Sequence, residues 1–216
     1  MPLVSSFSSP GFCVNSADEL LGLSVKLTAK PSRGAAIQDL RIVLHTPFSL
    51  EALHQCLILM PNITDLVVLL SEPDVPGLLD AVRLPKIEFF RTNAYHHLLT
   101  DFLASHTTIS ILQLAQCGED DDLCPLVVVD LQVQCIGGPA KCVSHLAHDG
   151  VSRLMMASSD RARTPSLLLR SIHPHLASLY TLTMDFYPDE HDVLSSIITV
   201  CKTVRKLKLI EQPSSQ

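Results

Sequence analysis

Apolar residues recur along this chain in a three-position pattern. In "PNITDLVVLL", residues 61–70, Ile63, Leu66 and Val68 occupy relative positions 1, 4 and 6 of the pattern. The first positions of the pattern, 19 to 28 residues apart, are Ile37, Ile63, Leu84, Ile109, Val128, Val151, Leu179 and Val204. Alternating apolar positions are typical of a strand with one buried face. The pattern therefore predicts eight copies of one internal repeat, each containing a short strand.

Helix-period segments lie between most of these strands. In "SLEALHQCLILMP", residues 49–61, Leu50, Leu53 and Leu57 lie on one helical stripe, and Ser49 is a helix-start signal. The other segments are "VPGLLDAVRLP", "AYHHLLTDFLASH", "GPAKCVSHLAHDG", "PSLLLRSIHPH" and "DEHDVLSSIITVC". The mean stride of about 24 residues is that of leucine-rich repeats, which bury their apolar faces only when stacked. We expect an α/β fold: a right-handed leucine-rich repeat solenoid, with a parallel sheet on the concave side and helices on the convex side.

The ends of the chain depart from the repeat. We expect residues 1–22 to be a flexible or capping segment, residues 23–210 the solenoid of about eight coils, and residues 211–216 a tail. "ELLGLSVKLTAKPS", residues 19–32, alternates Leu23, Val25 and Leu27 and predicts a capping strand. Two registers stay open: "LPKIEFF" aligns on Leu84 or on Ile87, and "CPLVVVDLQV" also fits two alignments.

Composition narrows the function classes. Apolar residues make up 47% of the chain and charged residues 18%, so a folded protein is expected. The formal charge is −6 and the basic residues are scattered apart from "KTVRKLK", which argues against nucleic acid as a partner. No apolar run approaches the ~20 residues that span a bilayer, so no membrane partner is expected. Seven cysteines without dense spacing indicate a reducing compartment, cytoplasmic or nuclear.

Two stretches resemble the irregular leucine-rich repeats of fungal, mushroom-type F-box proteins. They are "LLTDFLASHTTISILQLAQC", residues 98–117, and "CPLVVVDLQVQCIGGPAKCVSHLAHDGVSRL", residues 124–154. The resemblance implies the substrate-binding part of a ubiquitin-ligase receptor. The F-box itself is not seen, because "SADELLGLSVKL" leads directly into strand-like sequence. A Skp-type adaptor is therefore a partner only if an F-box is supplied.

Cysteine and histidine residues between positions 117 and 148 offer the competing interpretation, a metal-binding protein or an enzyme. The set consists of Cys117, Cys124, Cys135, Cys142, His145 and His148. Structural zinc sites usually contain a Cys-x2-4-Cys pair, and none is present here. No nucleophile elbow or phosphate loop occurs either. We therefore expect no metal, no cofactor and no enzyme activity, with these residues in core and helix positions.

The concave strand face is the remaining candidate site. Side chains at relative positions 3, 5 and 7 point away from the core, because successive strand residues alternate between faces. The expected protein-binding residues are Arg41, Val43, Val67, Leu69, Glu88 and Phe90. The apolar members would form an exposed patch of the kind that marks a partner site, unless residues 1–22 fold back over it. The sequence thus predicts a non-catalytic scaffold that recognises an unknown protein.

Overall fold

The computed structural model describes residues 11–118, 123–158, 164–172, 174 and 176–213. These residues fall into two compact units, which are divided between Ile109 and Ser110. The elements of the first unit are β1 (Phe12–Val14), α1 (Ala17–Ala29), α2 (Pro31–Gly34), β2 (Asp39–Leu44), α3 (Leu50–Ile58), β3 (Asp65–Leu70), β4 (Phe89–Thr92), the 3-10 turn η1 (His96–Leu99) and α4 (Thr100–Ser105). Those of the second are β5 (Ile111–Leu114), the 3-10 turn η2 (Pro125–Val128), β6 (Cys135–Pro139), α5 (Ala140–Leu146), β7 (Arg153–Ala157), α6 (Pro165–Ser171), β8 (Thr181–Phe186), α7 (Val193–Val200) and β9 (Lys206–Glu211).

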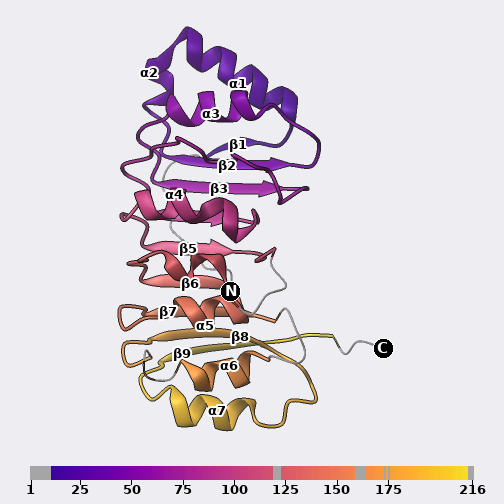
Figure 1. The fold of residues 1–216 in the computed structure, drawn as a ribbon, viewed down its shortest axis with the longest axis vertical. Coiled ribbons are helices and arrows are strands. Elements are labelled where there is room, and N and C mark those ends of the chain that lie inside the picture. The colour runs from indigo at the N-terminus through magenta and orange to yellow at the C-terminus, as the bar shows by residue number, and fades with distance from the viewer. Residues whose placement is uncertain (1–10, 119–122, 159–163, 173, 175, 214–216) are drawn as a thin grey trace. The chain divides into compact units, whose positions relative to one another are not determined.

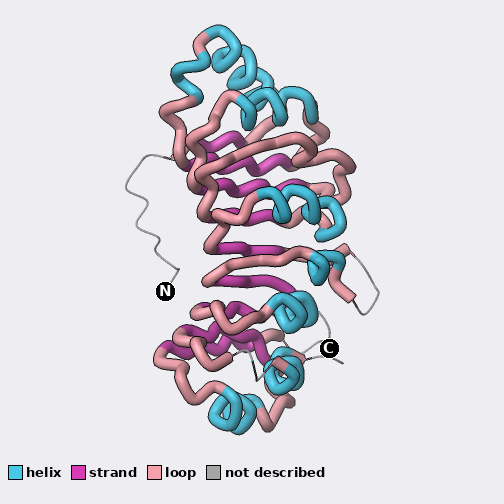
Figure 2. Tube along the Cα trace, turned by 60° about the vertical axis from the view of Figure 1, so that its left-hand side comes forward, coloured by secondary structure: helices cyan, strands magenta, loops and turns pink. Residues whose placement is uncertain are grey.

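Strands that follow one another in sequence are neighbours in each sheet. The order is β1-β2-β3-β4 in the first unit and β5-β6-β7-β8-β9 in the second, and within each unit the paired strands are parallel. In each unit the helices form a layer beside the strands (Figure 1, Figure 2). Helix α1 packs against α3, and α6 packs against both α5 and α7. The predicted α/β fold, with parallel strands alternating with helices, is confirmed.

The strand register aligns equivalent side chains of successive repeats in rows. Leu40 pairs with Leu66, and Leu66 with Phe90, while Ile136 pairs with Leu154. Side chains of these rows are fully buried: Leu40, Ile42, Leu66, Val68 and Phe90 in the first unit, and Leu112, Ile136, Leu154 and Leu182 in the second. Each coil thus covers the apolar face of the next, as the repeat pattern requires.

The expected capping strand at residues 19–32 is wrong, because most of this segment is helix α1. Ser16 caps the helix by accepting a hydrogen bond from the Glu19 N–H at 3.2 Å, and the Glu19 carboxylate accepts one from the Asn15 N–H at 2.7 Å. This arrangement is a variant of the capping box, in which Glu19 at position N3 accepts from Asn15, the residue before the N-cap, instead of from the N-cap itself. Leu20, Leu23 and Leu27 are buried at helical spacing. The expected boundary between residues 22 and 23 therefore falls inside a helix, and strand β1 precedes it.

The strand expected from Val128 to Val133 is also wrong. Residues Pro125–Val128 form η2, and the strand of this repeat is β6, made by "CIGGP". The two glycines carry no apolar side chain, so the three-position pattern passes over this strand. Gly138 takes an inward position where a Cβ would lie 3.1 Å from the Leu114 carbonyl oxygen and 3.2 Å from its Cβ. Close approach of β5 therefore explains the glycine.

Residues 75–85 differ from the expected helix as well. They form turns, in which Gly77 has φ 76° and Ala81 has φ 56°. Both values lie in the left-handed region, which cannot be part of a right-handed helix. The side chain of His54, from α3, stabilises these turns, because its Nε2 lies 2.9 Å from the Gly77 carbonyl and 3.0 Å from that of Leu78.

Candidate functional site

The first-unit sheet face is the side of β2, β3 and β4 that points away from the buried rows. It presents Asp39, Arg41, Val43, Asp65, Val67, Leu69, Phe89 and Arg91. The register places Asp65 between Asp39 and Phe89, and Val67 between Arg41 and Arg91. The face therefore carries three chemically different rows across the strands: one with two carboxylates, one with two guanidinium groups, and an apolar one formed by Val43 and Leu69.

Four of the predicted binding residues lie on this face. Arg41 is exposed, Val43 and Leu69 are half-buried, and Val67 is only 6% exposed. The register places Val67 between Arg41 and Arg91, and arginine side chains commonly cover apolar neighbours with their alkyl stems while their charged ends stay in water. The exposed apolar part of the face is thus smaller than the sequence suggested.

The prediction that Phe90 lies on this face is wrong. Phe90 is opposite Leu66 in the parallel register, which turns its ring into the core, where it is 0% exposed and lies 5.0 Å from the ring of Phe102. The repeat therefore starts at Ile87, the second of the two registers left open. Glu88 is exposed but precedes β4, so it is not the central residue of a strand as expected. Phe89 and Arg91 take the face positions instead.

The carboxylate row has an unusual electrostatic environment. Asp39 and Asp65 are directly opposite each other, and like charges in that position repel. Asp39 is 8% exposed and its carboxyl lies against the backbone of Gly11. Burial raises the pKa of Asp39, the nearby Asp65 charge raises it further, and Arg41 partly opposes both effects. A cationic group of a partner would relieve this repulsion.

A cleft of about 250 Å³ lies at the carboxyl ends of β2 and β3. Leu44 and Leu70 line it as buried residues, and its other apolar walls include Phe48, Val75 and Pro76. Glu72 and Asp74 add acidic groups. The cleft is smaller than the roughly 300–1,000 Å³ of most small-molecule sites, but it has room for one or two apolar side chains of a peptide.

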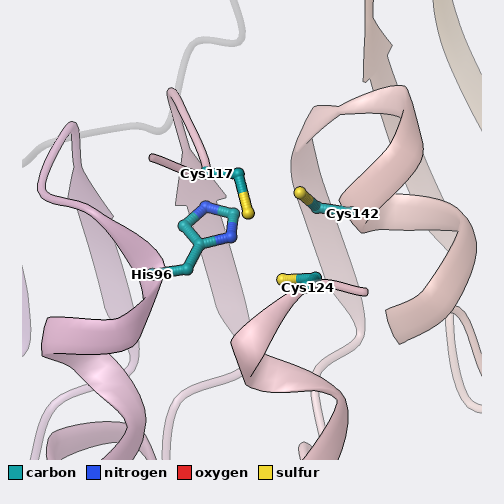
Figure 3. Close-up of side chains that lie close together, drawn as sticks. All are labelled: His96, Cys117, Cys124 and Cys142. Carbon is teal, nitrogen blue, oxygen red and sulfur yellow. The ribbon is translucent and has the colours of Figure 1, made fainter. Parts of the chain in front are cut away.

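The second unit contains a group of cysteines from separate segments. Cys117 follows β5, Cys124 is the residue before η2, and Cys142 lies on α5. Their sulfur atoms all lie within 4.8 Å of one another. Cys124 and Cys142 are fully buried and Cys117 is partly buried. Figure 3 shows the three thiol groups close together, and it also draws His96, a residue of the first unit. We call Cys117, Cys124 and Cys142 the cysteine cluster.

Crowding of the thiols affects their ionisation. A hydrogen bond with Cys124, together with burial and the proximity of the Cys124 and Cys117 charges, raises the pKa of Cys142 far above its ordinary value. Burial alone raises the pKa of Cys56 and of Cys201 to about 11. The mutual interaction of sulfur groups thus distinguishes the cluster from these two buried cysteines of the chain.

Only part of the predicted Cys and His set comes together. Cys135 is buried on β6 outside the cluster, and His145 is exposed on α5. The Nδ1 atom of His148 accepts a hydrogen bond from the Gly150 N–H at 3.1 Å. Sequence spacing did not reveal the cluster because its members lie in consecutive repeats, where the fold, and not a short Cys-x2-4-Cys loop, brings them together.

Comparison with known proteins supports the fold. No protein-family model matches the chain, and no curated protein matches it. The crystal structure of the leucine-rich repeat-containing protein LegL7 from Legionella pneumophila is similar, with a TM-score of 0.57 and 14% identity over 91% of this chain and 70% of that chain. The shared feature is the leucine-rich repeat fold. These comparisons give no support to a fungal F-box origin.

Among the residues that the structure describes, none of the helices is both long and apolar enough to cross a bilayer. The longest described helix, α1, has 13 residues. A spanning helix needs about 20.

Proposed function

We propose that this chain is a non-catalytic protein-recognition scaffold that binds its partner across the first-unit sheet face and the adjoining cleft. The observation that carries the proposal is the order of charged and apolar side chains along β2 and β3. Asp39 and Asp65 begin the strands, Arg41 and Val67 follow, then Val43 and Leu69, and the apolar cleft lies at the strand ends. A sheet face of this kind offers an extended peptide segment charged groups at the start of the strands and apolar groups at their end.

The expected partner is a peptide segment or loop whose chemistry complements these rows. It would place a basic side chain near Asp39 and Asp65, a carboxylate near Arg41 and Arg91, and an apolar side chain in the cleft beside Phe48. Charged groups set orientation and association rate, whereas the buried apolar anchor supplies most of the affinity. Arginine is well suited to this recognition because it binds carboxylates through two parallel hydrogen bonds.

The finer proposal is that the partner is a substrate of an F-box type ubiquitin ligase in the cytoplasm or nucleus. It rests on the F-box resemblance of residues 98–117 and 124–154 alone. Co-purification of a Skp-type adaptor and a cullin with the native protein tests it. If the partner is captured without either ligase subunit, this finer proposal is wrong while the scaffold proposal stands.

Paired substitutions test the scaffold proposal. The partner is first identified by affinity purification of the native protein, and its binding is then measured with purified components. Leu69→Asp and Arg41→Glu alter the first-unit sheet face. Leu21→Asp and Arg33→Glu make the same chemical changes at exposed positions on α1 and α2.

The face variants should weaken binding by at least about 30-fold each, the effect of losing a hot-spot contact of ~2 kcal/mol. The control variants should bind as the wild-type chain does. Circular dichroism of all four variants verifies that the fold is retained. Wild-type affinity in both face variants, with the fold intact, would refute the proposed site.

A further inference from the structure

We propose that the cysteine cluster of the second unit is a zinc site, in which the thiolates of Cys117, Cys124 and Cys142 hold one Zn²⁺ ion. Three sulfur donors within 4.8 Å of one another are the observation that carries this inference. Sulfur is the donor that zinc and copper(I) prefer among protein side chains. A zinc site would add to the scaffold function and does not depend on it.

The geometry suits a tetrahedral ion. A Zn–S bond of ~2.3 Å implies that sulfur atoms around one zinc ion lie about 3.8 Å apart. The present separations, all within 4.8 Å, need only small side-chain rotations to reach that value. Structural zinc sites with three cysteines take a histidine or a fourth cysteine as the remaining ligand.

The charge balance also favours a cation. Three sulfur groups at such short range can all be thiolates in a buried site only if a cation is present, and a divalent ion offsets most of their charge. As each sulfur binds, its proton passes to solvent, so three thiolates and one Zn²⁺ leave a charge of −1 before the fourth ligand is counted. The cluster contains no carboxylate, which disfavours magnesium and calcium.

The backbone around the cluster is shaped to bring its members together. Gly118 has φ 79°, so the chain turns sharply directly after Cys117. The carbonyl of Cys124 accepts a hydrogen bond from the Val127 N–H at 3.0 Å, which fixes the start of η2. Cys142 lies on α5, which packs against η2. A bound ion would link the segment after β5 to α5, across the long connection that precedes β6.

Cysteine is often buried simply as a small apolar residue, which is the competing explanation for the cluster. Cys56 and Cys201 fit that explanation: both are buried, and neither belongs to a group of metal-binding side chains in the described residues. They are therefore suitable controls. Oxidation of two cluster members to a disulfide is a second competing state, and it is distinguished by its response to reductant.

Metal analysis of the full chain tests the proposal. Protein purified under reducing conditions without chelator should contain one zinc ion per chain. After the zinc is removed, Co²⁺ should restore one equivalent and give intense thiolate-to-cobalt charge-transfer absorption, which Zn²⁺ then abolishes. X-ray absorption of the zinc form should show three sulfur ligands and one nitrogen or oxygen ligand.

Substitutions locate the site. Loss of even an outer-shell partner weakens metal affinity 10–100-fold, so Cys124→Ser and Cys142→Ser should each lower Zn²⁺ affinity by at least about 100-fold. Cys201→Ser, a buried cysteine of the same unit, should leave the affinity unchanged. Substoichiometric zinc together with no charge-transfer band in the wild-type chain would overturn the proposal, whatever the variants do. Wild-type affinity in the Cys124→Ser, Cys142→Ser double variant would overturn it equally.

Discussion

Phe89 and Phe90 provide a direct test of the strand register, because adjacent strand residues point to opposite faces. Phe90 is fully buried and 5.0 Å from Phe102, whereas Phe89 is half-buried on the first-unit sheet face. Truncating a buried phenylalanine to alanine costs about 3–5 kcal/mol, which includes the cavity left behind. The lost ring contact with Phe102 places Phe90→Ala near the upper end, at about 4–5 kcal/mol. Phe89→Ala should cost about 1 kcal/mol, because only part of that ring leaves water.

Urea unfolding and thermal melting measure the difference. For a chain of this size, each kcal/mol lowers the melting temperature by about 2–4 °C, so Phe90→Ala should melt about 8–20 °C below the wild type. Phe89→Ala should melt within about 4 °C of it. If Phe89→Ala proved the more damaging substitution, the register that pairs Leu66 with Phe90 would be wrong by one residue, and the first-unit sheet face would be wrongly assigned with it.

Other positions give independent tests. The His106 Nε2 accepts the Leu84 N–H at 2.9 Å and its Nδ1 donates to the Phe102 carbonyl at 2.6 Å, while burial lowers its pKa. The unfolded chain therefore binds a proton at higher pH, so the stability that this histidine supplies is present above about pH 6.5 and is lost as the pH falls below it. In urea unfolding, the free energy of unfolding of His106→Gln should decline less steeply between about pH 6.5 and 5 than that of the wild type. An identical slope would contradict this. Ser16→Ala should cost about 1 kcal/mol in urea unfolding through loss of the α1 cap, and no change would argue against the capping box. Gly138→Val should lower the melting temperature by several degrees because its Cβ meets Leu114. Gly22→Val on α1, where a Cβ meets nothing within 4 Å, should leave the melting temperature unchanged or slightly higher, because valine forms helix better than glycine. Chelation of zinc should lower the melting temperature of the wild type and leave that of Cys124→Ser unchanged, and an equal response in both would contradict the metal site.

The repeat could be predicted from sequence because burial requires the same spacing in each coil. Ile63, Leu66 and Val68 are all buried in the shared core, and the equivalent positions of the other repeats must be apolar for the same reason. The residue type of Ser49 predicts a helix start, and its hydroxyl accepts the Ala52 N–H at 3.1 Å. Features set by repeated burial or by local capping are therefore visible in the chain itself.

The sequence-based predictions are wrong where packing, capping or strand pairing of the backbone decides the structure and apolar periodicity does not. Strand β6 contains Gly137 and Gly138, whose presence reflects close packing against neighbours and not hydrophobicity. The α1 segment allows both a period of two and a helical period, and the capping pair Ser16 and Glu19 decides between them. The register of β4 depends on pairing with β3, a tertiary contact that "LPKIEFF" alone does not encode.

The candidate sites depend even more on tertiary structure. The identity of Arg91 as a face residue follows only from the corrected register. The cysteine cluster joins residues with six and seventeen residues between them, and no short-range signal predicts that their sulfur atoms meet. Cys117 and Cys124 belong to the coil that contains β5, and Cys142 belongs to the coil that contains β6, so the cluster becomes visible only when these two coils are stacked with the correct strands.

Site-specific photo-cross-linking tests the central claim, that a protein partner binds the first-unit sheet face. A photoreactive amino acid placed at Val43 lies beside Leu69 on that face, and one placed at Leu21 is exposed on the outer side of α1. With the purified partner, irradiation should give a covalent product from the Val43 position and none from the Leu21 position. Cross-linking from Leu21 with none from Val43 would contradict the account.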